Sequence, residues 1–585
     1  MKSQSVRPPT REGVGVSASS VEMTPVAHGY EERSQEYAQA QANRQSYVDA
    51  IVQSPALRKI VVAGPGTGKT YLFKEMLRGK TKTLTLTFVN SLIEQLALEL
   101  YGMSDVRTLH SFSRSELHTA TDKSITIFPK LSRVIGTDAE ILLGHKMEFE
   151  KMFYDRDDDN PGVDFYQNRK KYYGSYYGYT DVVFDLVRLY EADKSNVPEY
   201  EQVVIDEFQD FNLLEVSLID LLAEKSPILL AGDDDQALYD FKNADACHIR
   251  NKHGDYCPEY SSFELPYCSR STRVIVDAVN DVVCAATETG LLCGRVNKSY
   301  VYFECQEKDK ESTNNPKVVY THAYSKQIPW VIETKIKEIA KSLRSEFSVL
   351  VISQTRRQSD DITKGLAAKG FKNIRHALGD GGGEPNLVDG LKLIMEEPKS
   401  NLGWRIAAGC LLAEPDLAAL VMATNQPGAP LIVELISADQ RKAIKKLVAI
   451  CRKVKDGKPV DMEEIESVVV AYGATVQEIL ESHVGETLAA ADGTREGQPG
   501  MRGIPITATT VQSSKGLAAD YVFITHCDDQ YMVKHKDKSI VSDRDVCNFL
   551  VALTRARKRV YLISSNKTKE PRFVQWMADE RIDRT

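Results

Sequence analysis

The chain of 585 residues carries a formal net charge of −8, and 42% of its residues are hydrophobic. This length exceeds what one hydrophobic core organises, and it predicts roughly three to five domains of about 100 to 200 residues each. The negative net charge excludes nucleic-acid binding by bulk electrostatics, so any strand has to meet a local channel with stacking surfaces.

No run approaches the roughly 18 apolar residues of a membrane span, and residues 1–20 lack the apolar core of a signal peptide. We therefore expect a cytoplasmic protein with no membrane partner. The ten cysteines lack C-x-x-C spacing, so we expect reduced thiols rather than disulfides or a metal cluster.

The first predicted elements are a tail and one or two helices. Residues 1 to about 30 are polar and rich in Ser and Pro without periodicity, which predicts a flexible tail, and we set the tail boundary at residue 40. Residues 31–52 contain strong helix formers and no Gly or Pro, so helix should begin there.

Short apolar runs then alternate with longer helical stretches. The runs lie at 60–63, 83–88, 203–206, 228–231, 349–353, 522–525 and 560–564. Continuous apolar strands separated by helices indicate parallel sheets covered on both faces, so the predicted fold class is α/β.

Two stretches interrupt this alternation, and each is interpreted as an insertion into one of two parallel-sheet lobes. Residues 114–199 contain an acidic turn followed by a basic, tyrosine-rich segment, and residues 385–503 are mostly helical by pattern between Gly-rich linkers. Arg169, Lys170 and Lys171 in the first stretch either contact a nucleic acid or lie on a packed, solvated helix face, and the pattern leaves both open.

A glycine-rich turn, AGPGTGKT, lies between the strand at 60–63 and the next helix. Backbone N–H groups of such a P-loop wrap phosphates, while Lys69 neutralises the outer phosphates and Thr70 offers a hydroxyl to magnesium. Ala63 stands at the first position of the motif, where a small residue still fits the tight turn. The candidate nucleotide-binding residues of this segment are Ala63, Gly64, Pro65, Gly66, Thr67, Gly68, Lys69, Thr70 and Tyr71.

Two further segments place polar residues after buried strands. In VVIDEFQD, Asp206 can hold magnesium and Glu207 can orient and deprotonate an attacking water, although an Asp-Glu pair by itself more often belongs to a charged loop. In LLAGDDDQALYDF, Gln236 could hydrogen-bond a terminal phosphate, and Tyr239 and Phe241 could stack on bases, although such aromatic residues more often belong to a core.

The order and spacing of eight segments resemble the motif series of UvrD/Rep/PcrA-type superfamily 1 DNA helicases from about residue 41 onward. These segments are AGPGTGKT, LTFVNSLIEQLA, VRTLHSF, VVIDEFQD, LLAGDDDQALYDFKNA, LPYCSRST, TTVQSSKGL and FLVALTRARKRVYL. The resemblance implies two RecA-like lobes with ATP and Mg²⁺ between them and a mainly helical subdomain inserted in each. The implied domains are 41–113 with 200–264 (first lobe, 1A), 114–199 (1B), 265–384 with 504–585 (second lobe, 2A) and 385–503 (2B).

The resemblance also implies roles for individual residues. Gln45 would read the adenine edge, and Arg270 and Arg555 would reach the terminal phosphate from the second lobe, where a permanently charged, bidentate group makes hydrolysis depend on closure. The expected catalytic residues are Lys69, Asp206, Glu207, Gln236, Arg270 and Arg555. The expected nucleic-acid track consists of Thr87, Phe88, Asn90, Thr108, His110, Tyr239, Phe241, Thr510 and Ser513, whose hydroxyl, amide and aromatic groups suit phosphates and stacked bases.

The sequence departs from the family pattern at several positions. Ser269 stands where relatives carry a tyrosine that stacks on adenine, and Ala518 stands where a glutamate contacts the ribose. Gln512 replaces a histidine, and Phe241 and Lys242 replace a tryptophan and an arginine that serve coupling. The P-loop, the acidic pair and the arginines are retained, so we expect ATP hydrolysis and translocation more firmly than unwinding.

Three functions are compatible with these features. The leading hypothesis is an ATP-dependent 3′-5′ DNA helicase or single-strand DNA translocase. The alternative is a helicase-like ATPase subunit of a nuclease-containing complex in DNA repair or anti-phage defence, resembling Gabija-type systems, because the second insertion is compact. An RNA-directed motor is the third, since stacking and phosphate contacts do not read the 2′-hydroxyl.

Overall fold

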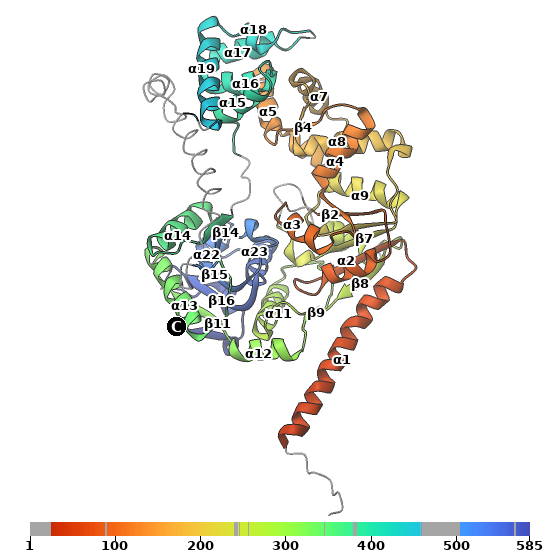
Figure 1. Cartoon of the computed structure of the whole chain (residues 1–585), viewed down its shortest axis with the longest axis vertical. Helices are drawn as coiled ribbons and strands as arrows, with labels where there is room; N and C mark the ends of the chain where they lie inside the picture. The colour runs from red at the N-terminus through yellow and green to blue at the C-terminus, as the bar shows by residue number, and fades with distance from the viewer. Residues whose placement is uncertain are drawn as a thin grey trace, which may run out of the picture.

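Two parallel β-sheets, each covered by helices on both faces, organise the protein (Figure 1). The computed structural model describes residues 25–585 except 88–89, 239–243, 245, 255–256, 344, 378–382, 427, 457, 459–502 and 567–568. The predicted α/β class is confirmed, and all seven apolar runs form strands. No helix in the described part of the chain is long and apolar enough to cross a bilayer.

The sheet of the first lobe has six parallel strands in the order β3-β2-β6-β7-β1-β8. Alternate residues of β1 point to opposite faces: Ile60 and Val62 join the core shared with the insertions, whereas Val61 and Ala63 pack against α1, α2 and α3. The strands are β1 (Arg58–Ala63), β2 (Thr83–Thr87), β3 (Asp105–Thr108), β6 (Gln202–Ile205), β7 (Ile228–Gly232) and β8 (Ser261–Leu265).

Helices of the first lobe follow its strands. The N-terminal helix α1 begins at Pro25, inside the segment expected to be a tail, and continues unbroken to Gln53. The remaining elements are α2 (Lys69–Leu77), α3 (Asn90–Glu99), η2 (Phe208–Asp210), α9 (Leu213–Lys225), η3 (Asp234–Gln236) and α10 (Cys247–Lys252).

The sheet of the second lobe has seven parallel strands in the order β13-β14-β12-β15-β16-β11-β17. One face packs on α11, α23 and α24, and the other packs on α13 and α14. The strands are β11 (Val318–His322), β12 (Val349–Ser353), β13 (Ile374–Ala377), β14 (Ile506–Thr510), β15 (Ala519–Thr525), β16 (Ala556–Ser564) and β17 (Ile582–Arg584). The helices are α11 (Arg273–Glu288), α12 (Gln306–Asn314), η5 (Ser325–Gln327), α13 (Ile328–Ser342), α14 (Arg356–Ala368), η7 (Gln512–Ser514), α22 (Asp529–Met532), α23 (Asp543–Leu553), α24 (Arg572–Gln575) and η8 (Asp579–Arg581).

A short parallel ribbon lies between the lobes. Strand β9 (Tyr267–Cys268) follows β8 directly and pairs with β10 (Val301–Tyr302), so the segment after α11 returns to the start of the second lobe. This return places residues 289–303 beside the P-loop.

The two insertions lie side by side in the upper part of Figure 1 and share one hydrophobic core. The first contains α4 (Leu109–Thr121), β4 (Thr126–Ile127), α5 (Leu131–Leu143), α6 (Phe149–Tyr154), α7 (Pro161–Tyr173), β5 (Tyr176–Tyr177), α8 (Tyr179–Ala192) and η1 (Lys194–Asn196). The second contains α15 (Leu387–Glu396), α16 (Asn401–Leu411), α17 (Glu414–Ala423), α18 (Ile432–Leu435) and α19 (Ala438–Lys455), and its residues 459–502 lie outside the described residues.

The basic residues of α7 are packed rather than exposed. Arg169 and Lys170 are buried and form ion pairs with carboxylates of the same insertion, while Lys171 is exposed. Their burial therefore contradicts a contact between a nucleic acid and Arg169 or Lys170. It also contradicts a solvent-exposed position for either residue. Their counterions come from α5 and α8, which the local sequence pattern does not reveal.

Candidate active site

The turn between β1 and α2 has the geometry of a P-loop. Gly66 and Gly68 adopt φ angles of 75° and 100°, a region that costs residues with a Cβ about 1–2 kcal/mol. A Cβ on Gly66 would lie 2.4 Å from the Cβ of Arg270, so the second lobe contacts this turn directly. The Lys69 ammonium donates to the carbonyl of Ala63 at 3.1 Å and is thereby folded over the turn.

A cavity of about 430 Å³ lies at this turn, between the two lobes. All six residues predicted to be catalytic line it, together with Ser269 and Ala518, where the sequence departs from the family pattern. The lining residues are Pro65, Gly66, Gly68, Lys69, Thr70, Gln95, Leu96, Glu99, Asp206, Glu207, Gln236, Ser269, Arg270, Gly516, Leu517, Ala518, Arg555 and Arg557.

The acidic pair stands at the carboxyl end of β6. Burial and the adjacent Glu207 carboxylate raise the pKa of Asp206. Burial would also raise the pKa of Glu207, but the ammonium groups of Lys515 and Lys69 outweigh it and lower that pKa. Gln209 donates to the Glu207 carboxylate at 2.6 Å and orients it. The pair therefore divides into a group that protonates more readily and one that stays ionised and can accept a proton.

Second-lobe cations contact the first lobe beside this pair. The Arg555 guanidinium donates to the Gln236 side-chain oxygen at 2.9 Å, and burial together with the nearby Arg270 lowers its pKa to about 10, so it stays charged at neutral pH. The buried Lys515 ammonium pairs with Asp210 and donates to the Gln236 carbonyl at 3.1 Å. These contacts make the position of Gln236 depend on both lobes.

Lys515 and Asp210 are functional candidates that sequence reasoning missed. Both belong to recognised motif segments, SSKGL and DEFQD, but they are 305 positions apart and pair only in the folded chain. The signal that could have found them is the presence of a lysine and an aspartate within two motif segments of the family pattern.

Gln45 and Tyr71 lie together at the outer side of the P-loop helix. The Tyr71 hydroxyl donates to the Gln45 side-chain oxygen at 3.1 Å, and the Gln45 amide donates to Asp49 at 2.8 Å. Arg44 reaches the same turn, because a Cβ on Gly68 would lie 2.8 Å from its guanidinium. This adds Arg44 to the groups that border the predicted nucleotide site.

The threonines of the predicted nucleic-acid track stand at the carboxyl ends of strands. Thr87 and Thr108 are register partners at the ends of β2 and β3, and Thr108 accepts the Ser111 N–H as the cap of α4. Thr510 ends β14 and contacts Ser513 at 3.3 Å.

The remaining track positions are described only in part. The His110 ring lies 4.9 Å from that of Tyr179. Phe88, Tyr239, Phe241 and Lys242 lie outside the described residues, as does the side chain of Asn90.

Comparison with known proteins identifies the same region. Residues 46–242 match the family model described as an AAA domain. The PcrA ATP-dependent DNA helicase of Staphylococcus aureus strain Mu50 is 30% identical over 146 residues, which are 23% of this chain and 19% of the relative. Its Staphylococcus epidermidis counterpart from strain ATCC 35984 is 31% identical over 110 residues, 18% of this chain and 15% of the relative. The chain thus matches less than a fifth of the length of either helicase.

A solved structure titled "The structure of PRRSV helicase" aligns over 90% of this chain and 55% of its own at 10% identity. Its TM-score of 0.30 is too low to indicate a shared fold. The predicted resemblance rests instead on the matched domain, the curated helicases and the two parallel sheets. Residues 46–242 are similar to the AAA-domain family, and the chain resembles the PcrA helicases of the UvrD/Rep type.

Proposed function

We propose that the protein hydrolyses ATP between its two lobes and uses the energy to move 3′ to 5′ along single-stranded DNA. The observation that carries the proposal is the cavity itself. Lys69, Glu207 and Gln236 from the first lobe line the same 430 Å³ space as Arg270 and Arg555 from the second. A site built from both lobes lets the chemistry respond to their relative position.

The residues present fit ATP and Mg²⁺. The positive φ of Gly66 and Gly68 leaves backbone N–H groups free of Cβ obstruction for phosphates, and Lys69 supplies a positive charge next to them. Thr70 and Asp206 are the oxygen ligands for Mg²⁺, which neutralises phosphate charge when bound.

The acidic and polar groups then divide the chemistry. Glu207 orients water and accepts its proton, because its pKa is lowered and its carboxylate is held by Gln209. Gln236, Arg270 and Arg555 position and stabilise the terminal phosphate.

Further assignments belong to the same proposal. Gln45, with Tyr71 beside it, borders the base, and the residues from Ala63 to Thr70 form the phosphate loop. The two lobes, 41–113 with 200–264 and 265–384 with 504–585, act as the motor, and the insertions 114–199 and 385–503 flank the strand. The DNA strand lies along the predicted track, whose threonines stand at the carboxyl ends of strands in both sheets and whose chemistry is sequence-tolerant.

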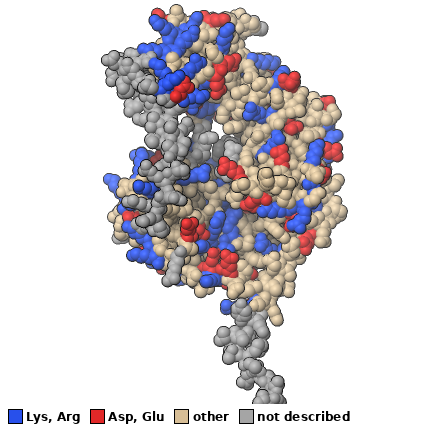
Figure 2. All heavy atoms as spheres, viewed as in Figure 1, with Lys and Arg blue, Asp and Glu red and all other residues tan. Residues whose placement is uncertain are grey.

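Local charge supports contact with a polyanion despite the net charge of −8. Lys and Arg side chains lie close together in the upper part of the visible face (Figure 2). Helix α19 contributes exposed Lys442, Lys445, Arg452 and Lys455 to the second insertion. Such clustering provides a positive surface that the whole-chain charge conceals.

ATPase measurements with and without single-stranded DNA test the proposal. Stimulation by DNA is expected, Lys69→Ala should lower kcat about 100-fold or more, and Glu207→Gln should keep ATP binding while losing turnover. Normal hydrolysis by Lys69→Ala would refute the P-loop assignment. Stronger stimulation of the ATPase by RNA of the same length would show that RNA, not DNA, is the substrate. Strand displacement only from a duplex with a 5′ tail would show that the protein moves in the opposite direction.

A second candidate function is a helicase-like ATPase that serves a nuclease within a repair or defence complex. The shared core of the two insertions favours it, because insertions that pack against each other limit each other's movement, and we propose that this restrains unwinding by the chain alone. DNA-stimulated ATPase without strand displacement, together with a nuclease that co-purifies, is the expected result. Robust unwinding by the isolated chain would contradict it.

A further inference from the structure

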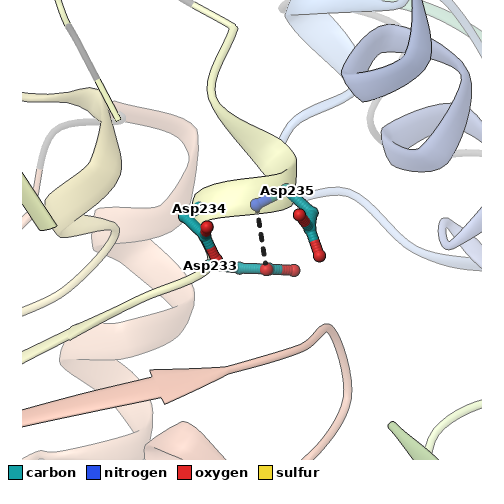
Figure 3. Close-up of side chains that lie close together, drawn as sticks. All are labelled: Asp233, Asp234 and Asp235. Carbon is teal, nitrogen blue, oxygen red and sulfur yellow. Dashed lines mark hydrogen bonds between the residues drawn. The ribbon is translucent and has the colours of Figure 1, made fainter. Parts of the chain in front are cut away.

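Three consecutive carboxylates follow β7 directly beside the candidate active site. Asp233, Asp234 and Asp235 are all buried, and their oxygens lie within 4.8 Å of one another (Figure 3). Such a set has the spacing of a cation site. In this fold the cation is part of the chain, because the Lys298 ammonium lies 2.9 Å, 2.5 Å and 2.7 Å from the three carboxylates in turn.

Two arginines complete the charge balance of this cluster. Arg295 binds Asp235 through two hydrogen bonds of 3.0 Å and 2.7 Å, and Arg250 donates to Asp234 at 3.0 Å. Burial alone would lower the pKa of Lys298, but the three carboxylates raise it above its usual value, so the ammonium is permanently charged. Three positive and three negative groups therefore meet in a buried region.

The three acidic residues differ in what they touch next. Asp233 accepts the Gln236 side-chain amide at 2.9 Å, and Gln236 in turn accepts from Arg555 at 2.9 Å. The Asp233 backbone N–H donates at 2.9 Å to Gln209, the residue that holds the Glu207 carboxylate. Asp233 is thus hydrogen-bonded directly to Gln236, the predicted phosphate sensor, and is linked through Gln209 to Glu207, the predicted base.

Among the contacts of the described residues, the side chains of Asp234 and Asp235 reach neither Gln236 nor Gln209, although the Asp235 backbone N–H donates to the Asp233 carboxylate at 3.2 Å. Asp234 accepts from Arg250 and from the Val296 N–H at 2.8 Å, and Asp235 accepts from Arg295. Of the cations in the cluster, Lys298 is accordingly the one that contacts Asp233.

The segment that carries Lys298 also contacts the back of the P-loop. The Tyr300 hydroxyl donates to the Pro65 carbonyl at 3.0 Å, and its ring occupies the space that a Cβ on Gly64 would need, 2.6 Å away. A cavity of about 80 Å³ lies between this segment, the P-loop and the acidic cluster. Residues 289–303, which follow a second-lobe helix, therefore contact both the phosphate loop and the acidic cluster.

We propose that Lys298 is a positioning residue for ATP hydrolysis: its ammonium fixes Asp233, and Asp233 fixes Gln236 and Gln209 in the orientation that turnover requires. This inference rests on the proposed ATPase function. It assigns to an internal lysine the place that a metal ion would take among three carboxylates. Because Lys298 does not line the nucleotide cavity, its loss should affect turnover rather than nucleotide affinity.

The test compares two neutral substitutions in the same cluster. Lys298→Met removes the cation that touches Asp233, whereas Arg295→Met removes one positive charge from the cluster without touching Asp233. We expect Lys298→Met to lower kcat about 10- to 100-fold with the ATP dissociation constant within about threefold of wild type, the usual loss when a supporting partner of a site is removed. Arg295→Met should keep kcat within about threefold.

Equal losses of kcat in the two variants, or a wild-type kcat in Lys298→Met, would overturn the inference. If Lys298→Met does not fold, the double variant Lys298→Met/Asp234→Asn restores the charge balance. Low kcat in the folded double variant supports the positioning role, and wild-type kcat refutes it. An inactive wild-type protein would instead refute the proposed function, so the two failures are distinguishable.

Discussion

The junction between the insertions is held by a buried carboxylate whose replacement should loosen it. Asp138 on α5 is fully buried and accepts from Arg169 on α7 at 2.5 Å and from Arg405 on α16 at 2.7 Å. Arg169 also donates to the Thr424 carbonyl and hydroxyl at the end of α17, at 3.1 Å and 2.9 Å. One acidic group of the first insertion thus neutralises an arginine from each insertion.

Asp138→Asn keeps the shape of the side chain and removes its charge, which leaves two buried arginines without a counterion. Breaking a buried pair in this way costs about 3–5 kcal/mol. Since about 1.4 kcal/mol is a tenfold change in an equilibrium constant, separation of the insertions should become about 100- to 4000-fold more frequent. Hydrogen exchange followed by mass spectrometry should show this loss of protection in α5, α7 and α16.

An exposed ion pair in the same region provides the control. Arg133 and Glu384 lie 3.5 Å apart, with 38% and 81% of their side chains exposed. Glu384→Gln should change stability by less than about 1 kcal/mol, because water screens such pairs. If Asp138→Asn and Glu384→Gln left exchange in α5 and α16 equally protected, the buried cluster would not hold the insertions together.

Three further substitutions probe the active site and the second lobe. Gly66→Ala introduces a Cβ at a φ of 75° and 2.4 Å from Arg270, so nucleotide affinity measured by titration should weaken about tenfold; unchanged affinity would show that the turn adapts. Lys515→Met removes a cation that lowers the pKa of Glu207, so the acid limb of kcat/KM should move to higher pH, and an unmoved limb would contradict that assignment. Burial lowers the pKa of His526, so this group stabilises the fold above about pH 6.5 and loses that contribution as pH falls through its folded-state pKa. His526→Asn, which tolerates the φ of 52°, should show a smaller decrease in Tm between about pH 7 and 5, and equal slopes would refute this.

The sequence predicts strands where burial makes them apolar and misses them where it does not. All seven apolar runs form strands, but six other strands of the two sheets were missed. Four of these, β3, β8, β13 and β17, are the edges of the sheets, and β11 and β14 are interior. An edge strand has one neighbour and tolerates polar residues, as SSFEL in β8 shows. Strand β14 is interior, yet its sequence ITATT contains three threonines whose β-branched side chains suit a strand without a strongly apolar pattern.

The same distinction applies to the site. Lys69 and Asp206 could be predicted because their chemistry is set by neighbours within a few positions, on one turn or at one strand end. The pairs Lys515–Asp210, Lys298–Asp233 and Asp138–Arg405 join residues far apart in the chain, and each looks like an isolated surface charge in the sequence. These residues are buried because of how the lobes and insertions pack together, and a local sequence pattern does not predict that packing.

On the proposed function, nucleotide binding exchanges contacts that the protein already makes with itself. Lys69 donates to a neutral carbonyl of its own loop, and Arg555 donates to the neutral Gln236 amide across the lobes. A phosphate oxygen is the stronger acceptor, because hydrogen bonds to ionised groups are roughly twice as strong, so both cations gain by turning to the nucleotide. Lys515 lies outside the cavity lining, where it pairs with Asp210 across the lobes. Turnover would therefore switch Arg555 and Lys69 between protein and phosphate, and loss of phosphate would be sensed through Gln236, whose position depends on contacts from both lobes.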